Sequence, residues 1–163
     1  EYIIVPELSG RTTAEAELGI IIGREARNIE PQSWKQYIAG FVPVIDVTSL
    51  EILKLNPRYL SLSKSFDTYF SFGPVIYTPD EFMNIDQIKV ETWHNRKVKA
   101  VNTVDHMRFS PEYLVSFLSQ VFVLKPGDII STGTPGAVEI EDGDLVEARI
   151  SGFSVLSNPV KKL

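Results

Sequence analysis

The chain has 163 residues, 44% of them hydrophobic and 23% charged, and these values predict one globular domain over residues 1–163. It contains no cysteine, which excludes disulfides, thiolate nucleophiles and cysteine-based zinc sites, and its formal net charge is −5. No apolar run approaches the ~20 residues that span a bilayer, and no cluster of lysine and arginine could follow a phosphate backbone, so we expect a cytoplasmic protein with neither a membrane nor a nucleic-acid partner.

Strands dominate the first half of the chain. Apolar and β-branched residues predict strands over residues 1–5, 13–23, 41–47 and 72–77. A helix is expected to begin at Pro31 and to end at Gly40, and residues 61–67 are expected to form a polar loop. Asp46 lies near the end of strand 41–47, where an alternative role is to cap the short helix expected after Ser49.

The second half adds a hairpin, a helix and further strands. The hairpin is expected over residues 88–93 and 97–101, and the strands over residues 129–131, 145–150 and 153–160. Ser110 and Pro111 are expected to open the helix, whose predicted apolar face consists of Leu114, Phe117, Leu118, Val121 and Phe122. Strands and helices do not alternate regularly, so the sequence predicts a mainly β, α+β domain.

Two glutamates stand out in strand 13–23. Side chains alternate along a strand, so Glu15 and Glu17 point to the same face, with Cβ atoms roughly 6–7 Å apart. The opposite face is apolar and consists of Ala14, Ala16, Leu18, Ile20 and Ile22. Like charges on a half-buried strand repel each other, and a divalent cation would compensate them. From this stretch alone, however, a pair of solvated glutamates on an exposed strand is the favoured interpretation.

The remaining candidate chemistry rests on oxygen atoms. Asp46 would give the glutamate pair a third carboxylate, and three carboxylates suit a hard divalent ion, Mg²⁺ first, with Mn²⁺ or Ca²⁺ possible. A glycosidase-type carboxylate pair is a competitor, but it leaves Asp46 unexplained. Lys64 and Thr134 are further polar candidates, although a lysine in such a loop is more often a solvated surface residue.

Other catalytic chemistries find little support. The chain has no nucleophile-elbow, phosphate-loop or dinucleotide-binding motif. His94 falls in the expected hairpin turn, where a solvated histidine is the favoured interpretation. His106 follows Asp105, where a catalytic base is the alternative, but a surface loop histidine is favoured there too. A hydrolytic triad is therefore not indicated.

Seven segments occur in an order that closely resembles the C-terminal catalytic domain of the fumarylacetoacetate hydrolase family. They are residues 14–23 (AEAELGIIIG), 39–48 (AGFVPVIDVT), 64–68 (KSFDT), 72–74 (FGP), 124–128 (LKPGD), 132–135 (TGTP) and 158–160 (NPV). Each segment is weak evidence alone, but all seven in order are specific, and together they cover nearly the whole chain. The resemblance implies a mixed β-sandwich roll with a few short helices, usually assembled as a homodimer.

The resemblance also implies a site and a reaction class. Mg²⁺ or Mn²⁺ would be bound by Glu15, Glu17 and Asp46, with Lys64 beside the metal as the catalytic residue and substrate contact. Thr134, with Gly133, would hold the carboxylate of the substrate. The family acts on 2-oxo acids and diketo acids by isomerisation, decarboxylation or C–C hydrolysis, and some members dehydrate sugar acids. A 2-oxo acid can chelate the ion, which stabilises the enolate that develops as a C–C or C–H bond breaks.

Some positions depart from the family pattern. Ile45, Leu50 and Leu53 stand where family members commonly have Asn, Arg and Gln, and Ser63 replaces a frequent glycine. Loss of the arginine removes a bidentate carboxylate contact. The family's N-terminal lid, which carries a His–Glu pair in hydrolytic members, has no counterpart in these residues.

We therefore expect an enzyme acting on a small 2-oxo or diketo acid, with isomerisation and decarboxylation slightly favoured because neither needs an attacking water. One alternative is a non-catalytic relative that keeps the fold, which Leu50 and Leu53 support. A second alternative is a 2-keto-3-deoxy sugar-acid dehydratase, although its hydroxyl-rich substrate would need more polar pocket residues than the sequence offers.

Overall fold

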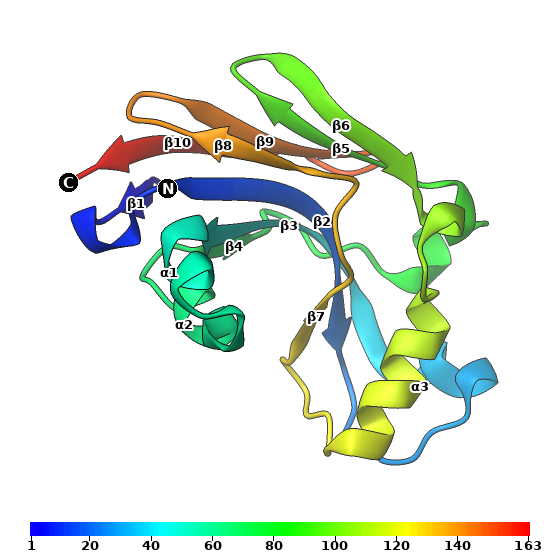
Figure 1. Cartoon of the computed structure of the whole chain (residues 1–163). Helices are drawn as coiled ribbons and strands as arrows, with labels where there is room; N and C mark the ends of the chain where they lie inside the picture. The colour runs from blue at the N-terminus through cyan, green and yellow to red at the C-terminus, as the bar shows by residue number, and fades with distance from the viewer.

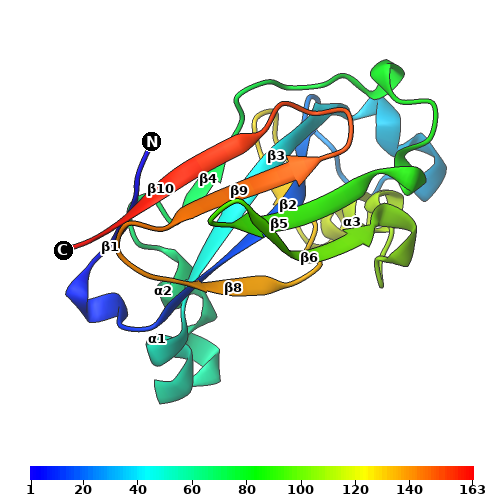
Figure 2. The same cartoon turned by 90° about the horizontal axis from the view of Figure 1, so that it is seen from above.

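Two five-stranded sheets lie face to face in the computed structural model, which describes all residues from 1 to 163 (Figure 1). The first sheet has the order β1 (Ile3–Val5), β10 (Leu156–Lys162), β9 (Leu145–Ile150), β5 (Lys89–His94) and β6 (Lys97–Thr103). The second has the order β4 (Phe70–Phe72), β3 (Ile38–Ser49), β2 (Thr12–Ile22) and β7 (Ile129–Ser131), and β8 (Ala137–Ile140) also pairs with β2. Viewed from above, β10, β9 and β5 cross over β2 and β3 (Figure 2).

The long strands β2 and β3 form the centre of the second sheet. They pair antiparallel over their whole length, with Glu15 opposite Asp46. On its other side β2 pairs with β8 at residues 12–15 and with β7 at residues 19–21, so the connecting loop, residues 132–136, lies beside residues 16–18. All pairings are antiparallel except the parallel one of β1 with β10, so the first sheet is mixed and the second is wholly antiparallel.

The core fills the space between the two sheets. The apolar face predicted for β2 is confirmed, since its five side chains are at most 1% exposed: Ala14, Ala16, Leu18, Ile20 and Ile22. They belong to one cluster of 28 buried residues with side chains from the first sheet. Full burial of a large apolar side chain contributes roughly 1.5–3 kcal/mol, so this face fixes which side of β2 carries the glutamates.

Three short α-helices lie outside the sheets. α1 (Leu50–Leu55) and α2 (Leu60–Lys64) lie near one end of the second sheet, and α3 (Pro111–Val121) lies near the other (Figure 1). Six 3₁₀ turns complete the helical elements: Glu7–Ser9, Pro31–Gln36, Pro57–Tyr59, Pro79–Glu81, Ile85–Gln87 and Val104–His106. No helix combines the length and the apolar character that crossing a bilayer requires.

The mainly β, α+β class is confirmed, but several local predictions were wrong. The helix expected from Pro31 is a 3₁₀ turn that ends at Gln36, and Gly40 lies inside β3 instead of ending a helix. The polar loop expected over residues 61–67 contains most of α2. The strand expected over residues 72–77 is β4, which ends at Phe72, followed by a loop that returns to β3 through one bridge between Tyr77 and Phe41.

The predicted face of α3 was also partly wrong. Phe117, Val121 and Phe122 are 47%, 59% and 48% exposed, whereas Ser116 and Ser119 are buried. The Ser116 hydroxyl donates to the carbonyl of Ile29, and the Ser119 hydroxyl accepts from the Ile29 amide. The helix therefore packs through Leu114, Val115 and Leu118 and also through hydrogen bonds to the backbone of another segment, a contact that an apolar periodicity does not reveal.

Candidate metal centre

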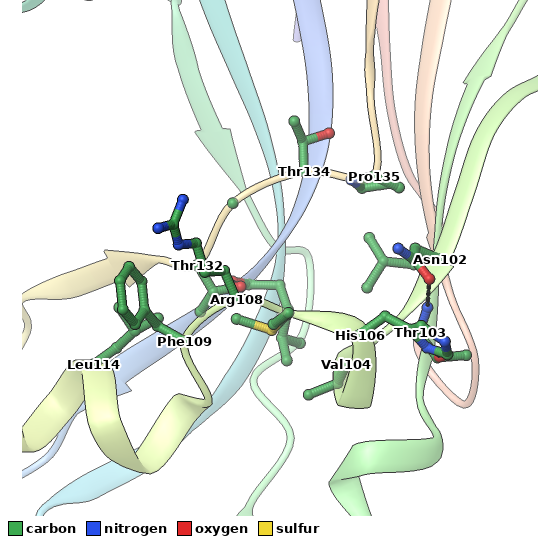
Figure 3. Close-up of a pocket in the computed structure, with 14 residues that line it drawn as sticks. Asn102, Thr103, Val104, His106, Arg108, Phe109, Leu114, Thr132, Thr134 and Pro135 are labelled. Atoms are coloured by element: carbon green, nitrogen blue, oxygen red, sulfur yellow. Dashed lines mark hydrogen bonds between the residues drawn. The ribbon is translucent and has the colours of Figure 1, made fainter.

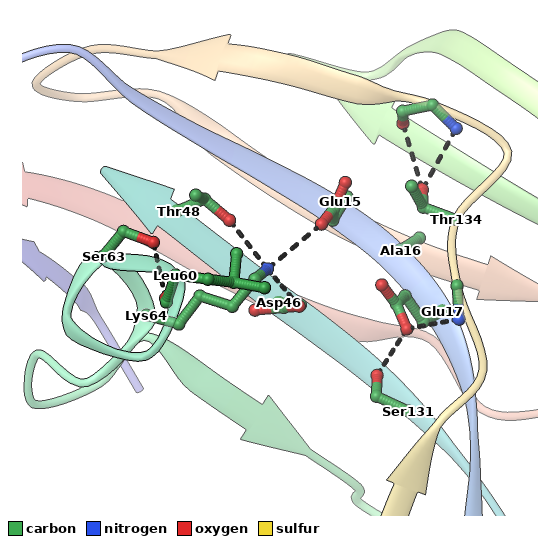
Figure 4. Close-up of polar contacts among 12 residues, drawn as sticks. Glu15, Ala16, Glu17, Asp46, Thr48, Leu60, Ser63, Lys64, Ser131 and Thr134 are labelled. Carbon is green, nitrogen blue, oxygen red and sulfur yellow. Dashed lines mark hydrogen bonds and ion pairs between the residues drawn. The ribbon is translucent and has the colours of Figure 1, made fainter. Parts of the chain in front are cut away.

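Three carboxylates converge on the face of β2 and β3 that points away from the other sheet (Figure 4). Glu15 and Glu17 lie on this face because residues two apart on a strand share a face, and Asp46 joins them because it pairs directly with Glu15. One oxygen of each residue lies within 4.8 Å of the others. A glycosidase-type pair would use two of these carboxylates and leave the third without a role, so three converging carboxylates favour a metal site.

The carboxylate of Glu17 is fixed in place from the neighbouring loop. Its side chain is buried, and its Oε2 accepts hydrogen bonds from the Ser131 hydroxyl at 2.5 Å and from the Gly133 amide at 2.7 Å. Ser131 ends β7, and Gly133 is the second residue of the loop 132–136 that lies beside β2. Donors of this kind orient a metal ligand and hold it in its ionised form.

Lys64 joins the cluster from the end of α2. Its Nζ lies 2.5 Å from Asp46 Oδ2, 2.8 Å from Thr48 Oγ1 and 3.4 Å from Glu15 Oε1 (Figure 4). The interpretation as a solvated surface lysine was wrong, because 30% of the side chain is exposed and its ammonium is bonded on three sides. Lys64 reaches the cluster partly because α2 forms in place of the expected loop and ends at Lys64, beside β3.

The charges of the cluster are only partly compensated. Burial raises the pKa of Glu15 above its ordinary value, and the neighbouring Glu17 and Asp46 add to this shift against the opposing effect of Lys64. Burial likewise raises the pKa of Glu17, although Ser131 and Gly133 oppose it. Burial lowers the pKa of Lys64, but its bonds to Asp46 and the charges of Asp46 and Glu15 outweigh that effect and raise it.

The residues present suit a hard divalent cation. Three ionised carboxylates and one ammonium leave two negative charges, which a divalent ion would neutralise. All three candidate ligands offer oxygen atoms, which Mg²⁺, Mn²⁺ and Ca²⁺ prefer. The alternative of solvated glutamates is not favoured, because the side chain of Glu15 is only 18% exposed and Glu17 is buried.

The other predicted contacts lie on the loop after β7. The Thr134 hydroxyl bonds within the loop, donating to the Gly136 carbonyl at 3.3 Å and accepting from its amide at 3.1 Å. The Gly133 amide is already bonded to Glu17. Contact of Thr134 and Gly133 with a substrate therefore stays a prediction, and the structure gives Gly133 a second part in the site as a support for Glu17.

Sequence reasoning missed Thr48 and Ser131 as members of the site. Thr48 lies two residues after Asp46, so the alternation along β3 places it on the same face as the carboxylate. That signal was present in the sequence. Ser131 carried no such signal, because its contact with Glu17 depends on how β7 pairs with β2.

Two of the residues that depart from the family pattern, Ile45 and Leu50, lie beside the cluster in sequence but do not contribute a polar group to it. Ile45 is fully buried in the core, and Asp46 follows it on the opposite face of β3. Leu50 is the first residue of α1, after the cap Ser49, whose hydroxyl accepts from the Ile52 amide. The alternative role of Asp46 as the cap is therefore excluded.

Neither histidine belongs to the cluster. His94 was expected to be solvated, but its side chain is 19% exposed and its Nε2 lies 2.8 Å from Asp144 Oδ2. His106 is exposed as expected, and its Nδ1 contacts both Thr103 and Asp105. The hydrolytic triad that the sequence disfavoured finds no support in this arrangement.

Comparison with known proteins identifies the same family that the ordered segments indicated. The model of the C-terminal domain of fumarylacetoacetate (FAA) hydrolase matches residues 1–161. An uncharacterized protein of Methanocaldococcus jannaschii is 38% identical over 162 residues, covering 99% of this chain and 67% of that protein.

Solved structures share the fold of this chain over nearly its whole length. A 5-carboxymethyl-2-hydroxymuconate delta-isomerase from Mycobacterium smegmatis superimposes with a TM-score of 0.93 at 29% identity, covering 99% of this chain and 63% of its own. A maleylpyruvate hydrolase from Sphingobium sp. SYK-6, in complex with a manganese(II) ion and pyruvate, has a TM-score of 0.89 at 26% identity, covering 99% of this chain and 59% of its own. This chain thus spans about three fifths of the solved chains that it matches.

Proposed function

Because the chain belongs to the fumarylacetoacetate hydrolase family, we propose that it binds Mg²⁺ or Mn²⁺ at Glu15, Glu17 and Asp46 and acts on a small 2-oxo or diketo acid. The reaction is an isomerisation, a decarboxylation or a C–C hydrolysis. The observation that carries this proposal is the cluster of three carboxylate oxygens within 4.8 Å, bordered by the ammonium of Lys64.

The proposed roles of the cation and of the surrounding residues follow from their charges. A bound divalent cation would supply the positive charge that stabilises the enolate form of a 2-oxo acid. Ser131 and Gly133 hold Glu17 in position through their hydrogen bonds to its Oε2. Lys64, oriented by Thr48 and Asp46, supplies a second positive charge and a proton at the edge of the cluster.

Lys64 also guides the choice among the reactions. Moving a double bond takes a proton from one atom of the substrate and delivers one to a carbon, and replacing a lost carboxyl group by hydrogen also delivers a proton to carbon. The Lys64 ammonium lies at the cluster, where it can deliver that proton and, once neutral, take up the proton that the substrate releases. We therefore place isomerisation and decarboxylation first. The matched solved structures include an isomerase and a hydrolase, so hydrolysis stays within the proposal.

The test is turnover of a substrate panel in the presence of Mg²⁺ or Mn²⁺. The panel contains oxaloacetate, acylpyruvates, 2-hydroxydiene-dioates and 2-keto-3-deoxy sugar acids, and each reaction is followed by absorbance and by identification of the product. Glu15→Ala is expected to abolish metal-dependent turnover, whereas Glu25→Ala, at an exposed position three residues beyond β2, is expected to leave it unchanged.

Three outcomes would count against the proposal. Failure of the metal to bind would overturn the site itself. Metal binding without turnover of any compound would favour a non-catalytic relative that keeps the fold, and turnover of the sugar acids alone would favour the dehydratase.

A further inference from the structure

A cavity of about 260 Å³ opens at one end of the space between the two sheets (Figure 3). Leu18 of β2, Val90 of β5 and the loop Thr132–Pro135 form part of its wall. Leu18 follows Glu17 on the same strand, and successive side chains of a strand point to opposite faces. The cavity and the carboxylate cluster therefore lie on opposite faces of β2, with the loop between them.

The charge of the cavity wall is positive. None of its fourteen residues is acidic, and Arg108 is the one residue among them that is permanently charged. Arg108 forms no ion pair or hydrogen bond within the chain, and its guanidinium lies 5.8 Å from the ring centre of Phe109. Arg108 is exposed, and other arginines of the chain also lack an acidic partner, but Arg108 is the one that lies at this cavity, and a carboxylate is the group that its planar donors fit best.

The rest of the wall suits a small apolar body. Six of the fourteen residues are hydrophobic, and the polar ones include Thr103 and His106. Nδ1 of His106 is engaged by Asp105 and Thr103, which leaves Nε2 without a partner in the chain. Apolar walls with a few convergent polar groups are typical of small-molecule sites, and this volume is at the small end of their range.

We propose that this cavity is a second binding site, which takes a small organic anion whose carboxylate lies against Arg108 and whose apolar part lies between Leu18 and Val104. The site shares the loop Thr132–Pro135 with the proposed metal centre, but it lies on the opposite face of β2 and needs no metal.

The loop between the two sites offers a physical link. The Thr132 amide and hydroxyl both donate to the Leu18 carbonyl, at 3.2 and 2.8 Å, and the next amide, that of Gly133, donates to Glu17. An anion that contacts Thr132 and Leu18 therefore also contacts the segment whose next residue, Gly133, holds Glu17 in position. Occupation of the cavity is expected to change the affinity of the cluster for its cation, and this part rests on the proposed function.

The first experiment measures binding without metal by calorimetry and by amide chemical shifts. The probe is benzoate, with benzyl alcohol as its neutral analogue. We expect benzoate to bind at least about tenfold more tightly than benzyl alcohol, to shift the amides of Val104 and Met107, and to lose about tenfold or more in affinity in Arg108→Met. Arg96→Met, at the far end of the β5–β6 hairpin, is expected to bind like the native chain. Equal affinity for the two probes, or native affinity in Arg108→Met, would overturn the site.

The second experiment measures Mn²⁺ affinity with and without saturating benzoate. We expect benzoate to change the Mn²⁺ affinity of the native chain by about fivefold or more. No change is expected in Arg108→Met, and this variant controls for direct contact of benzoate with the ion. An unchanged Mn²⁺ affinity would overturn the link through the loop. Glu17→Gln separates the two proposals, since it is expected to lose Mn²⁺ binding and to keep benzoate binding, whereas loss of both would contradict a separate site.

Discussion

Lys64 and a divalent cation serve the same electrostatic need at the carboxylate cluster. The ammonium lies 2.5 Å from Asp46 Oδ2 and compensates part of the charge that burial makes costly. A cation that binds Asp46 must share this carboxylate with Lys64 or displace it. The two positive charges therefore weaken each other's hold on Asp46, which gives Lys64 a measurable effect on metal affinity.

Lys64→Met is expected to lower turnover by about 10²–10⁴-fold while Mn²⁺ binds as tightly as before or more tightly. The reason is that the variant loses the proton donor but keeps all three carboxylates. Isothermal titration with Mn²⁺ and single-turnover kinetics give the two values. Loss of Mn²⁺ binding would instead mean that Lys64 is needed to assemble the cluster. Lys54→Met, at an exposed lysine of α1, serves as the control.

Ser131→Ala tests the support of Glu17 from the loop. The change removes the 2.5 Å hydrogen bond to Glu17 Oε2 but leaves the one from the Gly133 amide. Loss of such a partner of a metal ligand typically costs 10- to 100-fold in affinity, so we expect Mn²⁺ affinity to fall by about tenfold. Ser33→Ala, whose hydroxyl bonds only within an exposed turn, is expected to change nothing. Equal affinities of the two variants would rule out this role of Ser131.

At the scale of elements, the register of β2 against β3 is what assembles the site. The pairing of Glu15 with Asp46 follows from the buried alternation of both strands, and a shift by one residue would turn the carboxylates into the core. The sequence therefore predicted the common face of Glu15 and Glu17 from periodicity alone. It did not predict the contact with Asp46 from periodicity, since pairing between distant strands has no local signal.

The wrong predictions have a similar cause. Gly40 is a residue that often ends a helix, but tertiary contacts decide its conformation here. Pro31 does open a helical element, which is a 3₁₀ turn and ends before Gly40. Gly40 lies where β3 approaches the segment after β4, and the Tyr77 carbonyl accepts from the Phe41 amide next to it. Local propensity also missed α2, whose five residues are too few for a clear helical period. The position of Lys64 was therefore outside what the sequence alone could supply.

Gly40→Ala tests this explanation at the level of one strand. A Cβ at this position would overlap the carbonyl oxygen of Tyr77, a backbone atom that cannot move without breaking the bridge to Phe41. We expect a loss of about 2–4 kcal/mol in the free energy of unfolding, measured by urea denaturation. Ala39→Gly, at the exposed neighbouring position, is expected to cost about 1 kcal/mol or less. A nearly neutral Gly40→Ala would show that the close approach is not required.

At the scale of the whole molecule, the second sheet separates the carboxylate cluster on its outer face from the core and the cavity between the two sheets. The outer face of the second sheet carries the carboxylates, and the space between the sheets holds the core and, at its end, the cavity with Arg108. The loop 132–136 exists because β7 and β8 pair with separate parts of β2. One irregular segment thus touches both spaces. The homodimer implied by the family resemblance stays a prediction, which light scattering of the purified chain would test.

Stability is expected to depend on pH in opposite directions with and without metal. The pKa values of Glu15 and Glu17 are raised in the folded protein. Between pH 4.5, the ordinary pKa of a glutamate, and these raised pKa values, the metal-free fold therefore binds more protons than the unfolded chain. In that window the glutamates lower the free energy of unfolding as pH rises. With saturating Mn²⁺ the sign reverses, because protons compete with the ion and bound metal stabilises by about 2.7 kcal/mol at a hundredfold excess over its Kd.

The measurement compares urea midpoints at about pH 5 and about pH 7.5, with Mn²⁺ and with chelator, in the native chain and in Glu17→Gln. The comparison with the variant is needed because the pKa values of Asp105 and Glu139, both lowered by hydrogen bonds, act in the opposite direction at acidic pH. Glu17→Gln is expected to flatten the metal-free pH dependence and to abolish stabilisation by Mn²⁺. The same pH dependence in both proteins would mean that burial of Glu17 carries no free-energy cost, and the electrostatic reason for a cation at this cluster would be lost.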